Sequence, residues 1–234
     1  MKGNVVKHIV FDFFGTLVGY TPGHLSGEKY FNTYKFLTEN GYAINYKKFS
    51  SSFSDAFGEL EEKAKVTNKE FHMHDLAQLF FTNNFGEVPN KIQKDFIENY
   101  ITEWNRQILY YPQLKRFLDK LRGNYDLSII TNTHYKFLIY NNLRTMGISN
   151  YFNLILTSVE YGIRKPDSRI FREAIKRLSA KPETIIYVGD NYSEDYQGAI
   201  SAGIRCILLD PEHKWKGIIK DRVDSLFDIE RLLK

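Results

Sequence analysis

Four short segments of the chain carry polar side chains that could act together on an anionic substrate. Asp12 follows the apolar run His8–Phe11, and Thr131, Lys165 and Asp190 follow later in the chain. A carboxylate at the end of a buried strand is costly to desolvate, so its position is typical of a metal ligand or a nucleophile. A carboxylate can attack phosphorus to form an acyl phosphate when a divalent cation and an ammonium group offset the charge. The four residue types therefore predict nucleophilic chemistry at a charged group.

Strand and helix patterns alternate from Tyr111 onward. Short apolar runs bounded by turn residues indicate strands, and apolar residues at helical spacing indicate helices. The pattern predicts helices over 112–121, 135–146, 167–178 and 193–202, and strands over 127–131, 154–157, 184–188 and 205–209. Such alternation builds an α/β fold in which a doubly wound, Rossmann-like parallel sheet has helices on both faces.

The four polar segments fall at or just past the predicted strand ends. In an open parallel sheet, the loops at the carboxyl ends of the strands gather at one edge, where ligands bind. We therefore expect Asp12, Thr131, Lys165 and Asp190 to meet at that edge.

The stretch between the first and second of these segments differs from the rest of the chain in composition and periodicity. Residues 21–108 are rich in Phe, Tyr, Lys and Glu at helical spacing and predict about four helices and no strands. Breaks are expected at Asn40-Gly41, at Asn68 and over 85–89. The predicted organisation is a core domain of residues 1–20 and 109–234, interrupted by a helical domain of residues 21–108.

In their order and spacing, the four segments resemble the motifs of the haloacid dehalogenase superfamily, in the subfamily with a helical cap between the first and second motifs. The resemblance covers nearly the whole chain and implies a hydrolase, in most branches a phosphatase of small phosphorylated metabolites. It implies that Asp12 is the nucleophile, that Thr131 binds a phosphoryl oxygen and that Lys165 offsets the charge. The inserted helices would act as the cap that covers the site and selects the substrate.

The resemblance also implies a Mg²⁺ site built from oxygen ligands, which Mg²⁺ prefers. Its ligands would be Asp12, the backbone carbonyl of Phe14 and Asp190, with Asp195 as a further ligand or as an outer carboxylate. Three residues, Gly15, Thr16 and Asn132, complete the expected substrate-binding loops.

Phe14 departs from the family pattern. Most phosphatases of the family carry an Asp two positions past the nucleophile, which protonates the leaving alcohol and later activates water. Phe14 can do neither, and general acid–base catalysis contributes roughly 10²–10⁴-fold. We therefore expect slow turnover or a substrate with a good leaving group. His24 and His134 are alternative proton donors, although each is better explained as a surface or packing histidine.

Metal-independent 2-haloacid dehalogenases of the same superfamily are one alternative. They place a Tyr where this chain has Phe14, and they hold the substrate with an Arg that follows the first motif. Here the first arginine is Arg106, and Phe171 stands where those enzymes carry a second Tyr. They also lack a metal-binding carboxylate like that of Asp190. These differences favour the phosphatase.

Two further alternatives remain open at this stage. Phosphonatases of the superfamily use a Schiff-base lysine in the cap, and this insert offers Lys47, Lys48 and Lys63 without marking one of them as buried. A non-catalytic protein that binds a phosphorylated ligand would be expected if Phe14 had silenced the site. Turnover separates that protein from the enzymes, and metal dependence separates the phosphatase from the dehalogenase.

Composition limits the partners. The 234 residues carry a net charge of +4, with ten basic and twelve acidic residues in 18–108, so the positive excess lies with the motifs, as an anionic substrate favours. No dense Lys/Arg run with interleaved aromatics predicts nucleic-acid binding, and no apolar stretch reaches the length of a membrane span. The single cysteine, Cys206, lies in an apolar run and favours a reducing, cytoplasmic location. The sequence leaves the oligomeric state open.

Overall fold

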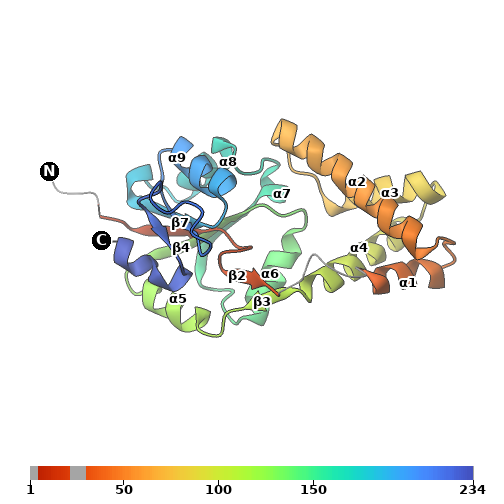
Figure 1. Cartoon of the computed structure of the whole chain (residues 1–234), viewed down its shortest axis with the longest axis horizontal. Coiled ribbons are helices and arrows are strands. Elements are labelled where there is room, and N and C mark those ends of the chain that lie inside the picture. The colour runs from red at the N-terminus through yellow and green to blue at the C-terminus, as the bar shows by residue number, and fades with distance from the viewer. Residues whose placement is uncertain (1–4, 22–29, 234) are drawn as a thin grey trace. The chain divides into compact units, whose positions relative to one another are not determined.

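The computed structural model describes residues 5–21 and 30–233. The chain divides into two compact units, Met1–Gly19 with Tyr110–Lys234 and Tyr20–Leu109 (Figure 1).

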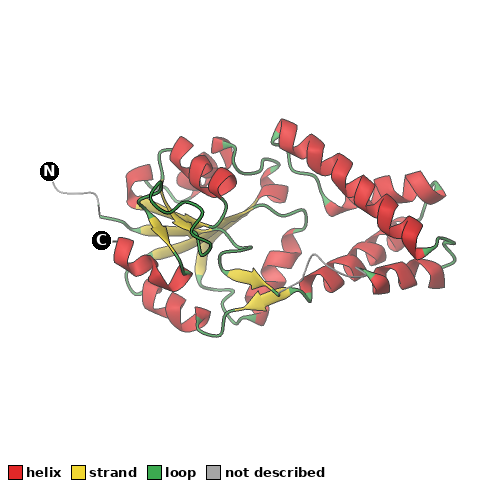
Figure 2. Ribbon diagram, viewed as in Figure 1, coloured by secondary structure: helices red, strands yellow, loops and turns green. Residues whose placement is uncertain are grey.

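The first unit is built on a six-stranded parallel sheet in the order β5-β4-β1-β6-β7-β8 (Figure 2). The strands of this sheet are β1 (His8–Phe11), β4 (Asp126–Thr131), β5 (Phe152–Thr157), β6 (Ile185–Gly189), β7 (Arg205–Leu209) and β8 (Arg222–Val223). All five residues of β6 are buried, and so are three of the four in β1, because helices cover both faces. The predicted parallel α/β sheet is confirmed.

Helices α8 (Ser168–Arg177) and α9 (Gly198–Ser201) lie on one side of the sheet, and α5 (Leu114–Arg122) lies on the other (Figure 1). Helix α6 (Lys136–Thr145) and the short α7 (Ser158–Tyr161) follow β4 and β5. Ile170 and Phe171 of α8 pack with Val10, Ile130 and Tyr187 in a buried cluster. The remaining helical turns of this unit are η1 (Pro182–Thr184), η2 (Tyr192–Gln197) and η3 (Leu226–Leu232).

The helix predicted over 193–202 is in fact two elements. A π-helical turn, η2, begins at Tyr192, and α9 continues from Gly198. The side chain of Asn191 accepts hydrogen bonds from the backbone N–H groups of Ser193 and Glu194, 3.0 Å away in each case, and so caps the first turn. Wider turns of this kind are frequent at functional sites.

The described residues of the second unit, 20–21 and 30–109, form four helices: α1 (Phe31–Glu39), α2 (Tyr46–Thr67), α3 (Met73–Phe85) and α4 (Asn90–Asn105). They end where turn residues predict: Asn68 ends α2 in the left-handed region with φ of 53°, and Gly86 ends α3. In its core, Phe80 and Phe96 stack with ring centroids 5.2 Å apart, and Phe53 packs edge-on against both.

Two short strands, β2 (Val18–Tyr20) and β3 (Ile108–Tyr110), pair as a separate two-stranded sheet where the chain passes from one unit to the other. The sequence prediction missed both strands, since three residues are too few to show a period. Across the described ranges, 5–21 and 30–233, no helix is both long and apolar enough to cross a membrane.

Candidate active site

The register of the central strands places Asp12 at the carboxyl edge of the sheet. Phe11 pairs with Ile129 of β4 on one side and with Val188 of β6 on the other. The backbone N–H of Asp12 then donates to the carbonyl of Val188 at 2.8 Å. Strands β1 and β6 are neighbours in the sheet. From β1 the next strand in the chain, β4, lies on one side, and from β6 the next strand, β7, lies on the other. Open α/β sheets bind ligands at such a switch point.

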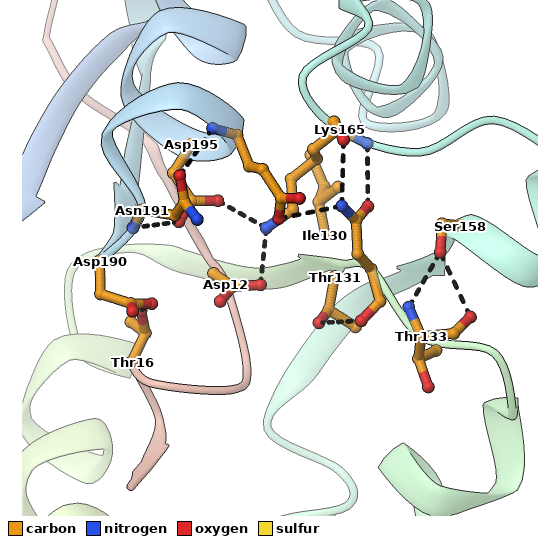
Figure 3. A network of polar contacts seen from close by, with 12 residues as sticks. Asp12, Thr16, Ile130, Thr131, Thr133, Ser158, Lys165, Asp190, Asn191 and Asp195 are labelled. Atoms are coloured by element: carbon orange, nitrogen blue, oxygen red, sulfur yellow. Dashed lines mark hydrogen bonds and ion pairs between the residues drawn. The ribbon is translucent and has the colours of Figure 1, made fainter. Parts of the chain in front are cut away.

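Lys165 lies at the centre of the site (Figure 3). Its Nζ is 2.7 Å from Oδ1 of Asp12 and 2.5 Å from Oδ1 of Asp195. Lys165, Asp195 and Asp12 are 2%, 1% and 6% exposed, so two carboxylates meet one ammonium group away from bulk water. Charge-assisted hydrogen bonds of this kind fix the position of the Asp12 carboxylate.

Lys165 lies further from the end of its strand than the other three residues do. Strand β5 ends at Thr157, and α7 with the loop after it separates that strand from Lys165. The side chain of Asn132, just past β4, holds this loop instead. Asn132 accepts from the backbone N–H of Lys165 at 2.8 Å and donates to the Lys165 carbonyl at 3.1 Å.

The three carboxylates of Asp12, Asp190 and Asp195 form one cluster, with an oxygen from each lying within 4.8 Å of the others. Thr16 donates to Oδ1 of Asp190 at 3.0 Å. Gly15 has φ of +83°, and a Cβ on it would lie 2.4 Å from Oδ2 of Asp190. The turn after β1 therefore needs glycine for its backbone conformation and for the close approach of Asp190.

Loss of hydration and the neighbouring charges shift the pKa values of these groups. Loss of hydration and the carboxylates of Asp195 and Asp190 raise the pKa of Asp12 to about 8, against the lowering effect of Lys165. Asp190 is partly open to solvent, but loss of hydration at its carboxyl group and the Asp195 carboxylate raise its pKa to about 6. Burial by itself lowers the pKa of Lys165, while Asp12 and Asp195 raise it above its usual range.

The remaining predicted residues lie at the same edge. Thr131, the last residue of β4, is buried, and its hydroxyl lies 3.5 Å from the carbonyl of Asn132. The next residue along, Thr133, donates its backbone N–H to Ser158 Oγ at 2.9 Å. Phe14 is half-buried, with its ring edge-on to that of Phe13. The carbonyl of Phe14 as a metal ligand and direct substrate contacts by Gly15, Thr16, Thr131 and Asn132 stay predictions. His24 lies outside the described residues, and His134 as a proton donor also stays a prediction.

Sequence reasoning missed two residues of the site. Glu194 accepts from Asn132 Nδ2 at 3.1 Å, and its carboxylate lies 3.5 Å from Arg164. Tyr187 lies within β6, with its hydroxyl 3.0 Å from Lys165 Nζ. A tyrosine inside an otherwise aliphatic buried strand was the available signal, because a buried phenol needs a hydrogen-bond partner.

The donor set fits a hard divalent cation. Three carboxylates around one ammonium group leave two excess negative charges, which a divalent cation would offset. Mg²⁺ prefers oxygen ligands and commonly binds through one or two carboxylates plus substrate oxygens.

A family model for haloacid dehalogenase-like hydrolases matches residues 9–209. The chain belongs to this family. A haloacid dehalogenase-like hydrolase fold accounts for the sheet order and for the positions of Asp12, Lys165 and Asp190 around one edge.

Curated relatives of this haloacid dehalogenase-like chain include phosphatases. The chain is 37% identical over 95 residues to glyceraldehyde 3-phosphate phosphatase of Methanothermobacter thermautotrophicus, a match that covers 41% of this chain and 42% of that protein. It is 28% identical to the enzyme of the same name from Methanopyrus kandleri, over 88% of this chain and 84% of that one. The first of these matches thus spans less than half the length of the relative.

Among solved structures, this chain is similar to 2-haloacid dehalogenase from Pseudomonas syringae. The two match with a TM-score of 0.74 and 21% sequence identity, over 98% of each chain. At that identity the likeness shows a shared fold.

Proposed function

We propose that the protein is a Mg²⁺-dependent phosphatase that acts on a small phosphorylated metabolite through a phosphoaspartyl intermediate on Asp12. The observation that carries this proposal is the meeting of Asp12, Asp190 and Asp195 around the buried ammonium group of Lys165. Curated relatives named as phosphatases of small phosphorylated compounds support the same reaction class.

In the proposed reaction, the Asp12 carboxylate forms a bond to phosphorus, and the bond from phosphorus to the leaving oxygen breaks with its electron pair. Water then attacks phosphorus, and the bond from phosphorus to the Asp12 oxygen breaks with its electron pair. The products are the free carboxylate and phosphate, and the proton lost by water leaves with the phosphate or the solvent. Lys165 holds Asp12 in place through the 2.7 Å hydrogen bond and offsets its charge. Asp12, Asp190, Asp195 and the Phe14 carbonyl would hold Mg²⁺. The bound ion supplies positive charge that lets phosphoryl oxygens approach these carboxylates.

The helical unit, Tyr20–Leu109, is proposed as the cap that selects the substrate. Its insertion between Asp12 and Thr131 in the chain supports this role, because inserts placed there can exclude water and choose the substrate. A cytoplasmic location is part of the same proposal, since small phosphorylated metabolites are found there.

The metal-independent dehalogenase reaction is less well supported. A reaction without a metal does not require a cluster of three carboxylates, and its negative charge would repel an anionic haloacid. Phe171, at the position where those enzymes carry a tyrosine, packs edge-on against the ring of Tyr187 in the core.

Hydrolysis of para-nitrophenyl phosphate tests the proposal, because its activated leaving group needs no proton from residue 14. We expect turnover with Mg²⁺, loss of turnover in EDTA, and loss in Asp12→Asn. Asp190→Asn is expected to raise the Mg²⁺ concentration needed for half-maximal activity by about 10–100-fold, and to change KM less. Activity that is indifferent to EDTA and to Asp190 would contradict the metal site. A protein without turnover on phosphates, haloacids and phosphonates would be a binding protein instead.

A further inference from the structure

Tyr187 lies in the middle of strand β6, and its hydroxyl group contacts Asp195 of the carboxylate cluster. Tyr187 is 0% exposed, and its ring packs edge-on against Phe171, with 5.2 Å between ring centroids. Its hydroxyl oxygen is 3.0 Å from each of three polar atoms: Lys165 Nζ, Asp195 Oδ1 and the carbonyl oxygen of Ile130. A buried phenol with three polar neighbours at this distance is part of the site's hydrogen-bond network.

The hydrogen-bonding capacity of Lys165 shows what Tyr187 contributes. An ammonium group has three N–H donors. In this structure they point to Asp12 Oδ1 at 2.7 Å, Asp195 Oδ1 at 2.5 Å and the Tyr187 hydroxyl at 3.0 Å. All three donors of Lys165 are thus directed to protein groups, and Tyr187 receives the third.

The same hydroxyl can donate its one proton to Ile130 or to Asp195, because both acceptors lie 3.0 Å away. The Ile130 carbonyl belongs to β4, the strand next to β1, while Asp195 belongs to the turn η2 that follows β6. Tyr187 therefore connects the strand that ends at Thr131 with the turn that carries a proposed metal ligand.

We infer that Tyr187 is a positioning residue for the proposed phosphatase reaction. It orients the Lys165 ammonium group toward the nucleophile Asp12 and holds Asp195 in the carboxylate cluster. The inference rests on the proposed function and deepens it by adding a buried residue that touches neither substrate nor metal. In this arrangement the three donors of Lys165 are directed at Asp12, Asp195 and Tyr187.

Tyr187→Phe is the direct test, since it keeps the ring that packs on Phe171 and removes the hydroxyl alone. Tyr151→Phe is the matched control. The Tyr151 hydroxyl also lies between a lysine and an aspartate, 2.7 Å from Lys115 Nζ and 2.6 Å from Asp119 Oδ1, and Tyr151 is 7% exposed. None of these three control residues belongs to the carboxylate cluster.

The measurements are kcat and KM for para-nitrophenyl phosphate at saturating Mg²⁺, the Mg²⁺ dependence, and the melting temperature of each variant. Mutating a residue that hydrogen-bonds to a metal ligand, without binding the metal itself, typically lowers activity or metal affinity by about 10–100-fold. We expect Tyr187→Phe to lower kcat by that factor with KM changed less than about threefold, whereas Tyr151→Phe lowers the melting temperature and leaves kcat unchanged. If Tyr187→Phe had the same kcat as wild type and only a lower melting temperature, Tyr187 would stabilise the fold without positioning the site, and the inference would be wrong.

Replacing Tyr187 with para-aminophenylalanine supplies a second variant. Its amino group can still donate and accept, so we expect it to restore most of the kcat that Tyr187→Phe loses. If the Phe variant does not fold, we expect the para-aminophenylalanine variant to keep kcat within about threefold of wild type. A folded para-aminophenylalanine variant with kcat about 10-fold or more below wild type would overturn the inference, because the hydrogen bonds would be present without their effect. A wild-type protein without Mg²⁺-dependent turnover would overturn the proposed function and this inference together, whereas an active wild type with an equally active Tyr187→Phe would overturn the inference alone.

Discussion

Phe14 separates the proposed reaction into steps that this site can assist and a step that it cannot. Its side chain is half-buried and lies edge-on to Phe13, with ring centroids 5.0 Å apart. The proposed nucleophile, Asp12, is held by its hydrogen bond with Lys165, which does not involve Phe14. Protonation of the leaving oxygen is the step that a phenyl ring cannot perform, and the cost depends on the leaving group.

Phe14→Asp should therefore raise kcat/KM for an alkyl phosphate, whose leaving group needs a proton, by as much as about 10²–10⁴-fold. The same substitution should change hydrolysis of para-nitrophenyl phosphate little. Phe14→Asn is the control, because it has a similar shape and cannot supply a proton. A gain of equal size with Asn, or no gain on the alkyl phosphate with Asp, would show that another group supplies the proton or that the site serves another reaction.

At the residue scale, the sequence indicated the chemistry better than it indicated the contacts. Asp12 and Asp190 could be chosen because a carboxylate after an apolar strand is unusual. The contacts of Lys165 with Asp195 and Tyr187 could not be predicted from the sequence, since they depend on side-chain directions across three separate segments. For the same reason, a sequence pattern could not show that the Thr16 hydroxyl is bonded to Asp190.

At the scale of elements, the turn after β1 sets the geometry of the proposed metal site. Gly15 has φ of +83°, and Asp190 packs where a side chain at position 15 would lie. Gly41 has nearly the same conformation, with φ of +85°, and nothing within 4 Å of the place where its Cβ would lie. The two glycines share a backbone requirement and differ in what surrounds them.

Gly15→Ala is expected to displace Asp190 and to lower Mg²⁺ affinity and kcat by at least about 10-fold. Gly41→Ala, the matched control, should cost about 1–2 kcal/mol of unfolding free energy for its left-handed backbone and leave activity unchanged. Steady-state kinetics across a Mg²⁺ titration, with chemical denaturation of both variants, would measure the difference. Equal activity in the two variants would contradict the role assigned to the contact between Gly15 and Asp190.

Sequence patterns predicted long elements well and short ones poorly. Strand β7 was predicted at its observed bounds, and β4 and β6 to within a residue at either end, because buried parallel strands are continuous apolar runs. Strand β8, with two residues, and the four-residue helix α7 have no detectable period. The undetected helix α7 lies between β5 and Lys165, and hydrogen bonds with Asn132 hold Lys165 at the site.

At the scale of the whole molecule, the site joins the stability of the fold to metal binding and pH. The pKa of Asp12 is raised to about 8 and that of Asp190 to about 6, whereas both are close to 4 in the unfolded chain. Between about pH 4 and the raised pKa of each group, the metal-free folded protein therefore binds more protons than the unfolded chain. The contribution of these groups to stability is therefore greatest at low pH and is lost as the pH rises through about 6 and about 8. Metal ligands must be deprotonated, so Mg²⁺ binding releases protons and tightens over the same range.

We accordingly expect Mg²⁺ to raise the melting temperature more at about pH 8 than at about pH 6. At a Mg²⁺ concentration 100-fold above Kd, the stabilisation is about 2.7 kcal/mol, or roughly 5–10 °C for a protein of this size. Thermal unfolding in EDTA and in Mg²⁺ at both pH values, with Asp190→Asn as the control, measures the effect. A shift that is independent of pH, or one that survives in Asp190→Asn, would contradict the assigned ligands.

The most direct test of the account is to trap the phosphoryl group on the protein. Enzyme mixed with para-nitrophenyl phosphate and Mg²⁺, quenched in acid within one turnover and digested, should yield a peptide that carries one phosphoryl group on Asp12. The modification should be absent without Mg²⁺ and in Asp12→Asn. Turnover that leaves Asp12 unmodified at every quench time, or a phosphoryl group on another residue, would contradict the phosphoaspartyl route.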